Sequence, residues 1–328
     1  MHDSGAPLSA RIVARRPLLY REGAEPKLDR PAHVRAASGI AWVGQRLAVV
    51  QDDAHFVALV DPTTGVADAI ALPAGADGKR VFDEARGTKH LKLDLEAVFS
   101  FEDGDGTHLI ALGSGSLPAR ERIVTARFAD ADGPVSALRV QDAISLYGGL
   151  RAAVAFSGSE LNLEGALVRG DQVLLFQRGN GAPARGVSPQ SAVGKLELSA
   201  LKRYLAGDGP APTLVESRVY NLGSASGVPY GFTDATLRPD GAILFLASAE
   251  ASADVTRDGA VFGTLVGLLR DDGGVRTTPL LDEAGEPTDA KAEGIALHPR
   301  DPSRAYLVVD PDAAEQPATL LEVVLTAI

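Results

Sequence analysis

Short hydrophobic runs, separated by polar turns containing Gly and Pro, recur along the whole chain. Five times a small or acidic residue opens such a run and a second run follows it; these copies lie at 38–42, 95–99, 163–167, 233–237 and 292–296. Runs of this length bounded by turn residues are typical of β-strands. Self-similarity at a regular period indicates a propeller or a solenoid. The pattern therefore predicts an all-β repeat protein.

The spacing of the copies favours a closed ring. The equivalent positions are 38, 96, 164, 233 and 293, roughly 60 to 70 residues apart. Too few residues follow position 293 for a full unit, and the segment before position 38 supplies what is missing. We therefore expect a strand at 10–20 to complete the last unit, which would remove exposed sheet edges. The prediction is a single domain, 1–328, folded as a five-bladed β-propeller with four antiparallel strands per blade and the last blade closed by the N-terminal strand.

Turn residues divide each unit into its strands. The first unit is expected at 39–43, 46–50, 56–61 and 66–72, and the second at 95–101, 109–112, 122–128 and 135–140. Later strands are expected at 173–176, 192–198, 214–220, 243–247, 263–269, 275–281, 305–309 and 320–325. Two segments between strands, 145–154 and 199–207, have a helical pattern, and the second begins with Ser and ends with Gly.

Composition limits the possible function. The chain has 328 residues, of which 45% are hydrophobic and 23% charged, so it can bury a sizeable core. It has no cysteine, which excludes disulfides, thiolate metal sites and cysteine nucleophiles. A net charge of −11 argues against nucleic acid and anionic membranes as partners. No secretory signal or membrane-spanning run is visible, so we expect a cytoplasmic monomer, or a periplasmic or secreted one if a leader has been removed.

Side chains with oxygen atoms occupy all five equivalent positions: Ser38, Glu96, Glu164, Thr233 and Glu293. In a propeller these positions face one mouth of the central channel, where three carboxylates repel one another unless a cation or protons compensate them. Hard oxygen donors without His or Cys select Ca²⁺, and a crowded protein cage disfavours the strongly hydrated Mg²⁺. The alternative is that these residues bond to backbone amides of adjacent blades and hold no metal.

The ring resembles that of the calcium-activated nucleotidases, the five-bladed apyrase family, which places Ser, Glu, Glu, Ser and Glu around a channel calcium. Here the order is the same, with Thr233 in place of one Ser. The segments 231–233 and 293–295 are also similar to the family's sequence around its last two ligands. The resemblance implies a substrate phosphate beside the calcium. The turn at 51–55 has the family's two aspartates but lacks its following Arg-Thr-Gly. Phytase-like and lactonase-like propellers, which also place a metal at the axis, are a weaker resemblance.

Further polar side chains reach the same mouth from the loops that follow each second strand and precede each first strand. By position, Asp52 and His55 are the candidate catalytic groups, which would prepare water while the ion polarises a phosphoryl or ester oxygen. The candidate substrate-binding residues are basic: Arg80, Lys89, His90, Arg120 and Arg178. A basic loop is also a common solvated surface, and a lone histidine is also a common structural residue.

The sequence thus leads to two hypotheses. The first is a calcium-dependent hydrolase of a small anionic substrate, phosphorylated or ester, at the channel mouth. The second is a non-catalytic binding propeller with a structural channel calcium. No P-loop is present, and the Gly-rich turn at 113–116 lacks the strand-to-helix setting of a nucleophile elbow. Whether the chain is an enzyme stays open at this point.

Overall fold

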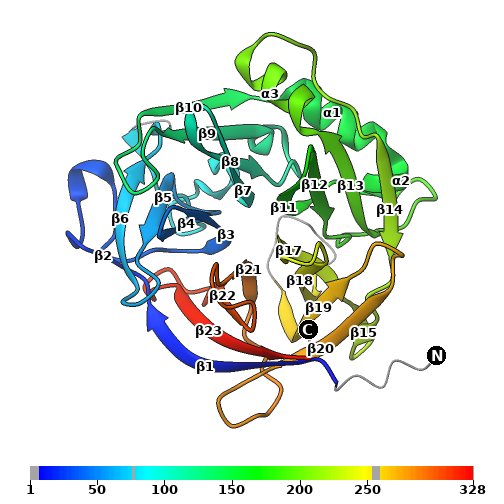
Figure 1. Cartoon of the computed structure of the whole chain (residues 1–328). Coiled ribbons are helices and arrows are strands. Elements are labelled where there is room, and N and C mark those ends of the chain that lie inside the picture. The colour runs from blue at the N-terminus through cyan, green and yellow to red at the C-terminus, as the bar shows by residue number, and fades with distance from the viewer. Residues whose placement is uncertain (1–6, 76–77, 253–258, 328) are drawn as a thin grey trace.

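Antiparallel sheets stand around a central axis, with the first strand of each sheet innermost (Figure 1). The computed structural model describes residues 7–75, 78–252 and 259–327. The innermost strands β3, β7, β11, β17 and β21 contact one another in cyclic order, β21 next to β3. The structure is therefore an all-β, propeller-like fold.

The first three sheets follow the predicted order, each strand pairing with the next along the chain. The first contains β3 (Ala37–Val43), β4 (Arg46–Gln51), β5 (Phe56–Val60) and β6 (Val66–Ala71), with the short β2 (Leu19–Tyr20) added at its edge. The second contains β7 (Leu95–Asp103), β8 (Gly106–Gly113), β9 (Arg122–Phe128) and β10 (Ala137–Asp142). The third contains β11 (Leu163–Arg169), β12 (Gln172–Gln177), β13 (Ser191–Glu197) and β14 (Glu216–Tyr220).

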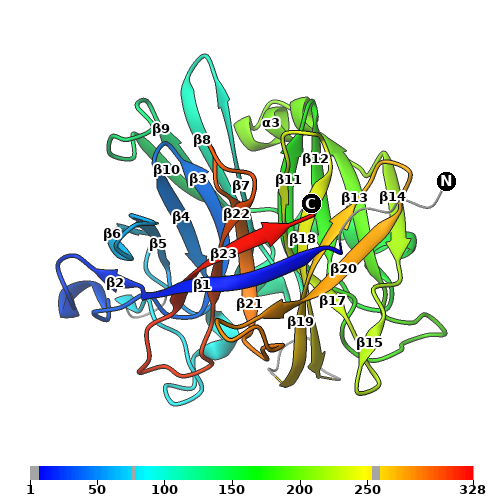
Figure 2. The same cartoon turned by 60° about the horizontal axis from the view of Figure 1, so that its bottom comes forward.

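The remaining strands form one eight-stranded sheet where two separate sheets of four were expected. It contains β17 (Gly231–Leu237), β18 (Ile243–Ala251), β19 (Ala260–Leu269), β20 (Val275–Leu281), β21 (Ala292–Leu297), β22 (Arg304–Val309), β23 (Thr319–Thr326) and β1 (Ser9–Pro17). The N-terminal β1 pairs antiparallel with β23, as expected for an outer closing strand. It also pairs in parallel with β20 through two residues, and this short contact joins the two halves (Figure 2).

Helices lie outside the sheets. The prediction at 145–154 is divided into α1 (Ile144–Ala152) and α2 (Val154–Ser157), and the prediction at 199–207 corresponds to α3 (Leu198–Ala206). Buried side chains of all three helices pack into the core between the second and third sheets. The other short elements are the hairpin β15 (Ser224–Ala225) and β16 (Val228–Pro229) and the single 3-10 turns η1 (Pro26–Leu28), η3 (Lys89–Leu91) and η4 (Pro118–Arg120). None of the helices in the described ranges is long and apolar enough to cross a bilayer.

Burial decreases from the axis outward, which explains why the inner and middle strands are more continuously hydrophobic in sequence than the outer strands. In the first sheet all five residues of β5 are buried, and β3 is buried except at Trp42. The outer strands β10 and β14 have mainly exposed or half-buried residues. Middle strands have a neighbouring sheet against each face, so they appear in the sequence as continuous hydrophobic runs.

The inner strands approach so closely that some positions admit only glycine. A Cβ atom on Gly39 would lie 2.7 Å from the carbonyl oxygen of Glu96 in the next inner strand, and one on Gly294 would lie 3.0 Å from the Cα of Gly39. A Cβ on Gly165 would lie 2.9 Å from the Cα of Asp234. These atoms belong to backbone and cannot rotate away. The glycine that follows Ser38, Glu164 and Glu293 is therefore a packing requirement at the axis.

Replacing Gly39 by Ala should destabilise the fold by about 2 kcal/mol, because the added methyl group must push two inner strands apart. Urea unfolding followed by circular dichroism measures the change. The matched control is Gly148→Ala on the exposed face of α1, where nothing lies within 4 Å of the added atom. That change should leave stability unaltered or raise it by up to about 1 kcal/mol. Equal midpoints for the two variants would contradict the close-packed axis.

Candidate functional site

All five predicted ring residues occupy the same place in their strands. In each inner strand the pairing with the next strand slips by one residue, and the skipped residues are Ser38, Glu96, Glu164, Thr233 and Glu293. A β-bulge of this kind leaves one residue out of the ladder and turns its side chain to a new direction. The sequence repeat therefore identifies a five-fold structural equivalence.

The two hydroxyl members of the ring bind backbone. The Ser38 hydroxyl donates to the carbonyl of Leu95, and the Thr233 hydroxyl donates to the carbonyl of Ala292 at 3.0 Å. Each bond joins one inner strand to the next. For these two positions the structure has hydrogen bonds to the backbone of the next inner strand, but to its carbonyls and not to the amides that the alternative interpretation named. Thr233 does not line the central cavity.

Asp234 makes a similar connection next to Thr233. Its side chain is buried and accepts a hydrogen bond from the backbone amide of Ile295 at 2.8 Å. Burial raises the pKa of the Asp234 carboxyl well above its ordinary value, although hydrogen bonds from backbone amides oppose the shift. The carboxyl thus links the inner strands β17 and β21.

A polar cavity of about 50 Å³ lies at the ring end of the inner strands. Its lining contains seven acidic residues, namely Asp52, Asp94, Glu96, Glu164, Glu250, Glu293 and Asp310, and five basic residues, namely Lys89, Lys92, Arg120, Arg178 and Lys291. If all of them are ionised, two negative charges are left uncompensated. The cavity is therefore a densely charged site that internal ion pairs compensate only in part.

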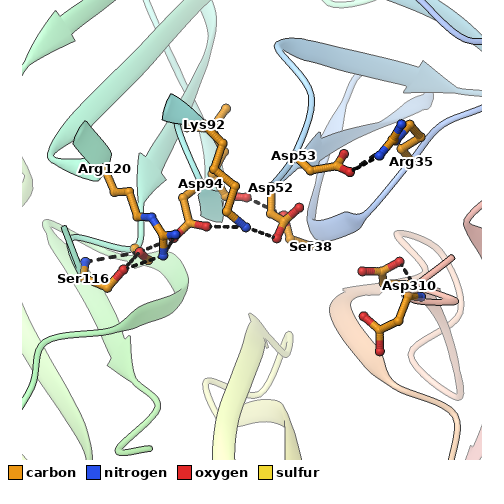
Figure 3. Close-up of polar contacts among 12 residues, drawn as sticks. Arg35, Ser38, Asp52, Asp53, Lys92, Asp94, Ser116, Arg120 and Asp310 are labelled. Carbon is orange, nitrogen blue, oxygen red and sulfur yellow. Dashed lines mark hydrogen bonds and ion pairs between the residues drawn. The ribbon is translucent and has the colours of Figure 1, made fainter. Parts of the chain in front are cut away.

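Lys92 is the central cation of one half of this site (Figure 3). Its ammonium lies 2.5 Å from an Asp52 oxygen and 2.7 Å from an Asp94 oxygen, and the side chain is 5% exposed. Arg120 contacts the other Asp94 oxygen at 3.0 Å. Burial opposes the charge on Lys92, but the carboxylates around it prevail and raise its pKa well above the ordinary value. Lys92 therefore stays protonated and holds the two aspartates together.

Basic side chains also face the other acidic residues of the ring. Arg178 contacts Glu164 at 3.2 Å and also pairs with Glu250. Lys291 lies 3.5 Å from Glu293 and 2.9 Å from Asp312. Two of the three ring glutamates thus have a cation from the chain itself. Burial nevertheless raises the pKa of Glu164 above its ordinary value, against the opposing charge of Arg178.

Glu96 is the ring glutamate without such a partner. Among the described residues it forms no ion pair and accepts no hydrogen bond, and burial followed by the nearby Glu164 and Asp94 carboxylates raises its pKa well above the ordinary value. One oxygen each from Glu96, Asp52 and Asp94 lie within 4.8 Å of one another, a spacing that could hold a metal ion. One oxygen of Asp52 and one of Glu293 are buried without a partner in the described part of the chain. The acidic groups that lack a cation from the chain are thus concentrated near Glu96, whose raised pKa means that it binds a proton when no cation is present.

The structure separates the predicted catalytic pair. Asp52 lines the central cavity, whereas His55 does not. The His55 ring is buried against Phe82 with ring centroids 4.4 Å apart, and its Nδ1 lies 3.0 Å from the carbonyl of Pro73. Burial lowers the pKa of His55 to about 4. His55 is therefore placed as a neutral, packed side chain outside the cavity.

The predicted substrate-binding residues are separated in the same way. Lys89, Arg120 and Arg178 line the cavity, whereas Arg80 and His90 do not. The Arg80 guanidinium is bound to the carbonyl of Leu72 at 2.8 Å, and His90 is exposed.

The sequence analysis missed several residues of the cavity, although the repeat contains a signal for them. Asp94, Asn162 and Lys291 each lie two residues before a ring position, and all three line the cavity. Asp52, Arg178 and Asp310 each follow the second strand of a unit, and their backbone amides bond the carbonyls two residues before the ring at 3.0 to 3.3 Å. Extending the alignment by two positions toward the N-terminus would have found Asp94, Asn162 and Lys291.

Replacing Lys92 by Gln should lower the unfolding free energy by about 3 kcal/mol at neutral pH, because Asp52 and Asp94 would lose the cation between them. Urea unfolding in a chelator measures the change. The control is Lys79→Gln, a charge loss at an exposed position of the same loop, which should change stability by less than about 0.5 kcal/mol. A Lys92→Gln midpoint equal to that of the unmodified chain would contradict the role given to Lys92.

The burial of His55 predicts a pH dependence of stability. The pKa of His55 is about 4 in the folded chain and 6.5 for an unperturbed histidine, so the unfolded chain binds the extra proton between these values. Stability should therefore fall as pH decreases from about 6.5 to 4, by about 3 kcal/mol from this group. His55→Phe keeps the contact with Phe82 and cannot titrate, so the difference between the two pH profiles isolates the contribution. Parallel profiles would show that His55 is not buried as described.

The comparisons with known proteins indicate a family and a fold. A model described as "Family of unknown function (DUF6929)" matches residues 33–325. No curated protein matches the sequence. Among solved structures, a chain assigned as an exo-β-1,3-galactanase from Bifidobacterium bifidum s17 is similar at 10% identity, with coverage of 95% of this chain and 96% of that one and a TM-score of 0.51.

Two further solved structures are similar over most of this chain. A GH43 β-1,3-galactosidase matches at 10% identity over 94% of this chain and 59% of that one, with a TM-score of 0.51. The glutaminyl cyclase of Myxococcus xanthus matches at 13% identity over 98% of both chains, with a TM-score of 0.46. The identities are so low that the likeness to the galactanase and the galactosidase concerns the fold alone. Because the family model matches residues 33–325, the chain belongs to DUF6929, a family of unknown function.

Proposed function

We propose that the fold is a five-bladed β-propeller in which the contact between β1 and β20 joins the last two blades. The cyclic order of the five inner strands supports this assignment, as does the equivalent bulge in each of them. The joining contact is only two residues long and parallel, whereas the four main strands of each proposed blade pair antiparallel with one another. A short edge contact between blades explains the eight-stranded sheet without changing the count.

We further propose that the chain is a calcium-dependent hydrolase that acts on a small anionic substrate, phosphorylated or ester, at the mouth of this propeller. The observation that carries the proposal is that the central cavity adjoins a side pocket of about 340 Å³ and shares Asp52, Lys89, Lys92 and Asp310 with it. The side pocket has room for a small molecule. Seven acidic and three basic residues line it, so an anionic group would have to lie beside the shared lysines and the bound ion. Acidic groups for an ion and basic groups for a substrate thus meet at one place.

The residues around Glu96 fit a calcium ion. Glu96, Asp52 and Asp94 offer hard oxygen donors at a suitable mutual distance, and two buried carboxylate oxygens of the cavity have no partner in the described part of the chain. Calcium takes about six to eight oxygen ligands and accepts irregular geometry. This set differs from the ring expected from the sequence, because Glu164 and Glu293 face Arg178 and Lys291. When bound, the ion would supply Lewis-acid polarisation of a substrate oxygen.

Asp52 is the best placed general base. One of its oxygens contacts Lys92, and the other is buried without a partner among the described residues. The second oxygen can accept a proton from water as the water oxygen bonds to phosphorus or to the ester carbon and the bond to the leaving oxygen breaks. Lys92 fixes the orientation of Asp52 through their ion pair. Lys89 lines both the cavity and the side pocket, where it can bind the anionic group of the substrate.

A second function, cation binding without catalysis, is favoured by a different observation. Arg178 and Lys291 already neutralise much of the ring, and the cavity itself, at about 50 Å³, has room for an ion with a few waters but not for a substrate. In this case calcium would only hold the inner strands together. The two functions share the ion and differ in the use of the side pocket.

Calcium should raise the thermal midpoint of metal-stripped protein, because an ion bound only by the folded chain stabilises it. Glu96→Gln should abolish most of this increase. The control is Glu102→Gln, an exposed acid on the same strand, which should leave the response intact. Since Asp52 and Asp94 would hold the ion and also pair with the Lys92 ammonium, Lys92→Gln should bind calcium more tightly than the unmodified chain.

The enzymatic part of the proposal is tested separately on calcium-loaded protein. Nucleoside triphosphates, p-nitrophenyl phosphate, p-nitrophenyl acetate and a simple lactone serve as probes. Turnover of one of them that requires calcium and falls about 100-fold or more in Asp52→Asn supports a hydrolase with Asp52 as its base. Calcium binding without turnover of any probe supports the binding function, and no calcium response at all would overturn both.

A further inference from the structure

A second depression of about 740 Å³ lies at the other end of the inner strands, between the first sheet and the sheet that contains β22. It is lined by the β3–β4 turn, the β5–β6 turn and the β21–β22 turn, together with Trp42 and Tyr306. Trp42 is four residues beyond Ser38 on β3, which corresponds to roughly 13 Å along the strand. The depression shares no residue with the central cavity.

The aromatic side chains of this depression are held in fixed positions. The Trp42 indole donates a hydrogen bond to the carbonyl of Leu297 at 2.8 Å, and its ring meets that of Tyr306 edge to face with centroids 5.9 Å apart. Trp42 is only partly buried, although it belongs to an inner strand whose other residues are buried. A fixed and accessible indole gives a ligand an apolar surface without an entropic cost of ordering it.

Hydrogen-bonding groups beside the indole are left available. His298 Nδ1 accepts hydrogen bonds from the backbone amides of Arg300 at 3.2 Å and Asp301 at 3.0 Å, so its Nε2 carries the proton and is a donor. Neither this Nε2 nor the exposed guanidinium of Arg300 has a partner within the described ranges. Gln45 donates to Asp132 at 3.3 Å, which leaves its own amide oxygen as an acceptor.

The charges of the depression balance. Arg46 and Arg300 are its two basic residues, and Asp61 and Asp132 its two acidic residues. Asp61 already accepts a hydrogen bond from Thr63 of its own turn, and Asp132, which lies between β9 and β10, accepts one from Gln45 of the β3–β4 turn. An uncharged ligand with several hydroxyl groups matches such a surface better than a strongly charged one, since hydroxyls both donate and accept.

We propose that this depression is a second small-molecule site and that it takes an uncharged sugar ring. An apolar face of the ring packs on Trp42, and its hydroxyls bond His298, Arg300 and Gln45. The site is independent of the proposed hydrolase, because it lies at the other end of β3 and uses none of the same residues.

Trp42 is the single tryptophan of the chain, so its fluorescence reports directly on the site. The probes are glucose, galactose, mannose, xylose and arabinose and their β-linked disaccharides, each titrated to about 50 mM, with calorimetry as the second measurement. At least one sugar should change the fluorescence with saturation. Arg300→Ala, an exposed change that should not affect folding, should weaken binding of that sugar about ten-fold, and so should His298→Ala.

Glu96→Gln at the other mouth is the control and should bind the sugar as the unmodified chain does. Saturable binding that is insensitive to both Arg300→Ala and His298→Ala would place the sugar elsewhere and overturn the proposal. Binding only of a nucleoside or an aromatic carboxylate, titrated in parallel, would overturn the ligand class. The absence of any saturable response would overturn the site itself.

Discussion

The close approach of the five inner strands is the constraint on which the other features of this fold depend. At Gly39, Gly165 and Gly294 the neighbouring strands leave no room for a Cβ atom. If the strands paired without a bulge, the side chains that precede these glycines would point into the same narrow space between the inner strands. The bulge at each ring position releases one residue from the ladder and turns its side chain away from the crowded pairing. The same device that allows the strands to meet therefore collects five polar side chains at one end of the axis.

Collecting carboxylates in a buried place creates an electrostatic cost that must be compensated. The chain uses its own cations: Lys92 lies between two aspartates, Arg178 between two glutamates, and Lys291 beside Glu293. Truncating one partner of such a pair leaves the other charge buried and alone, which is more costly than never having placed the pair there. The carboxyl group of Glu96 is not compensated in this way, because no cation among the described residues lies within ion-pair distance of it. The corner around Glu96 is therefore the part of the cavity where a carboxyl group needs either a proton or a cation from outside the chain.

The repeat made much of this accessible from sequence. Its period gave the strand order, the closing strand at the N-terminus and the equivalence of the ring residues, because all of these follow from one pattern repeated five times. The contact between β1 and β20 could not be anticipated, since it depends on how the ends of two strands meet in space. The same limit applies to charge. Lys92 lies close to the predicted substrate-binding residues Lys89 and His90 in the sequence, but only the fold shows that it turns inward between Asp52 and Asp94. In the same way, only the fold shows that His55 packs against Phe82.

The inner strands also explain why both ends of the axis can carry chemistry without interfering with each other. Each is held by hydrogen bonds to the next strand outward and by the inner strands on its two sides, so a side chain at either end inherits a rigid support. β3 is the clearest case, with Ser38 in the bulge at one end and Trp42 fixed through its indole at the other. Between them lie Ile40 and Ala41, both buried in the core. A ligand bound at one end could change binding at the other end only by moving this packed core. The two ends are therefore expected to act separately, and selection can change one without altering the other.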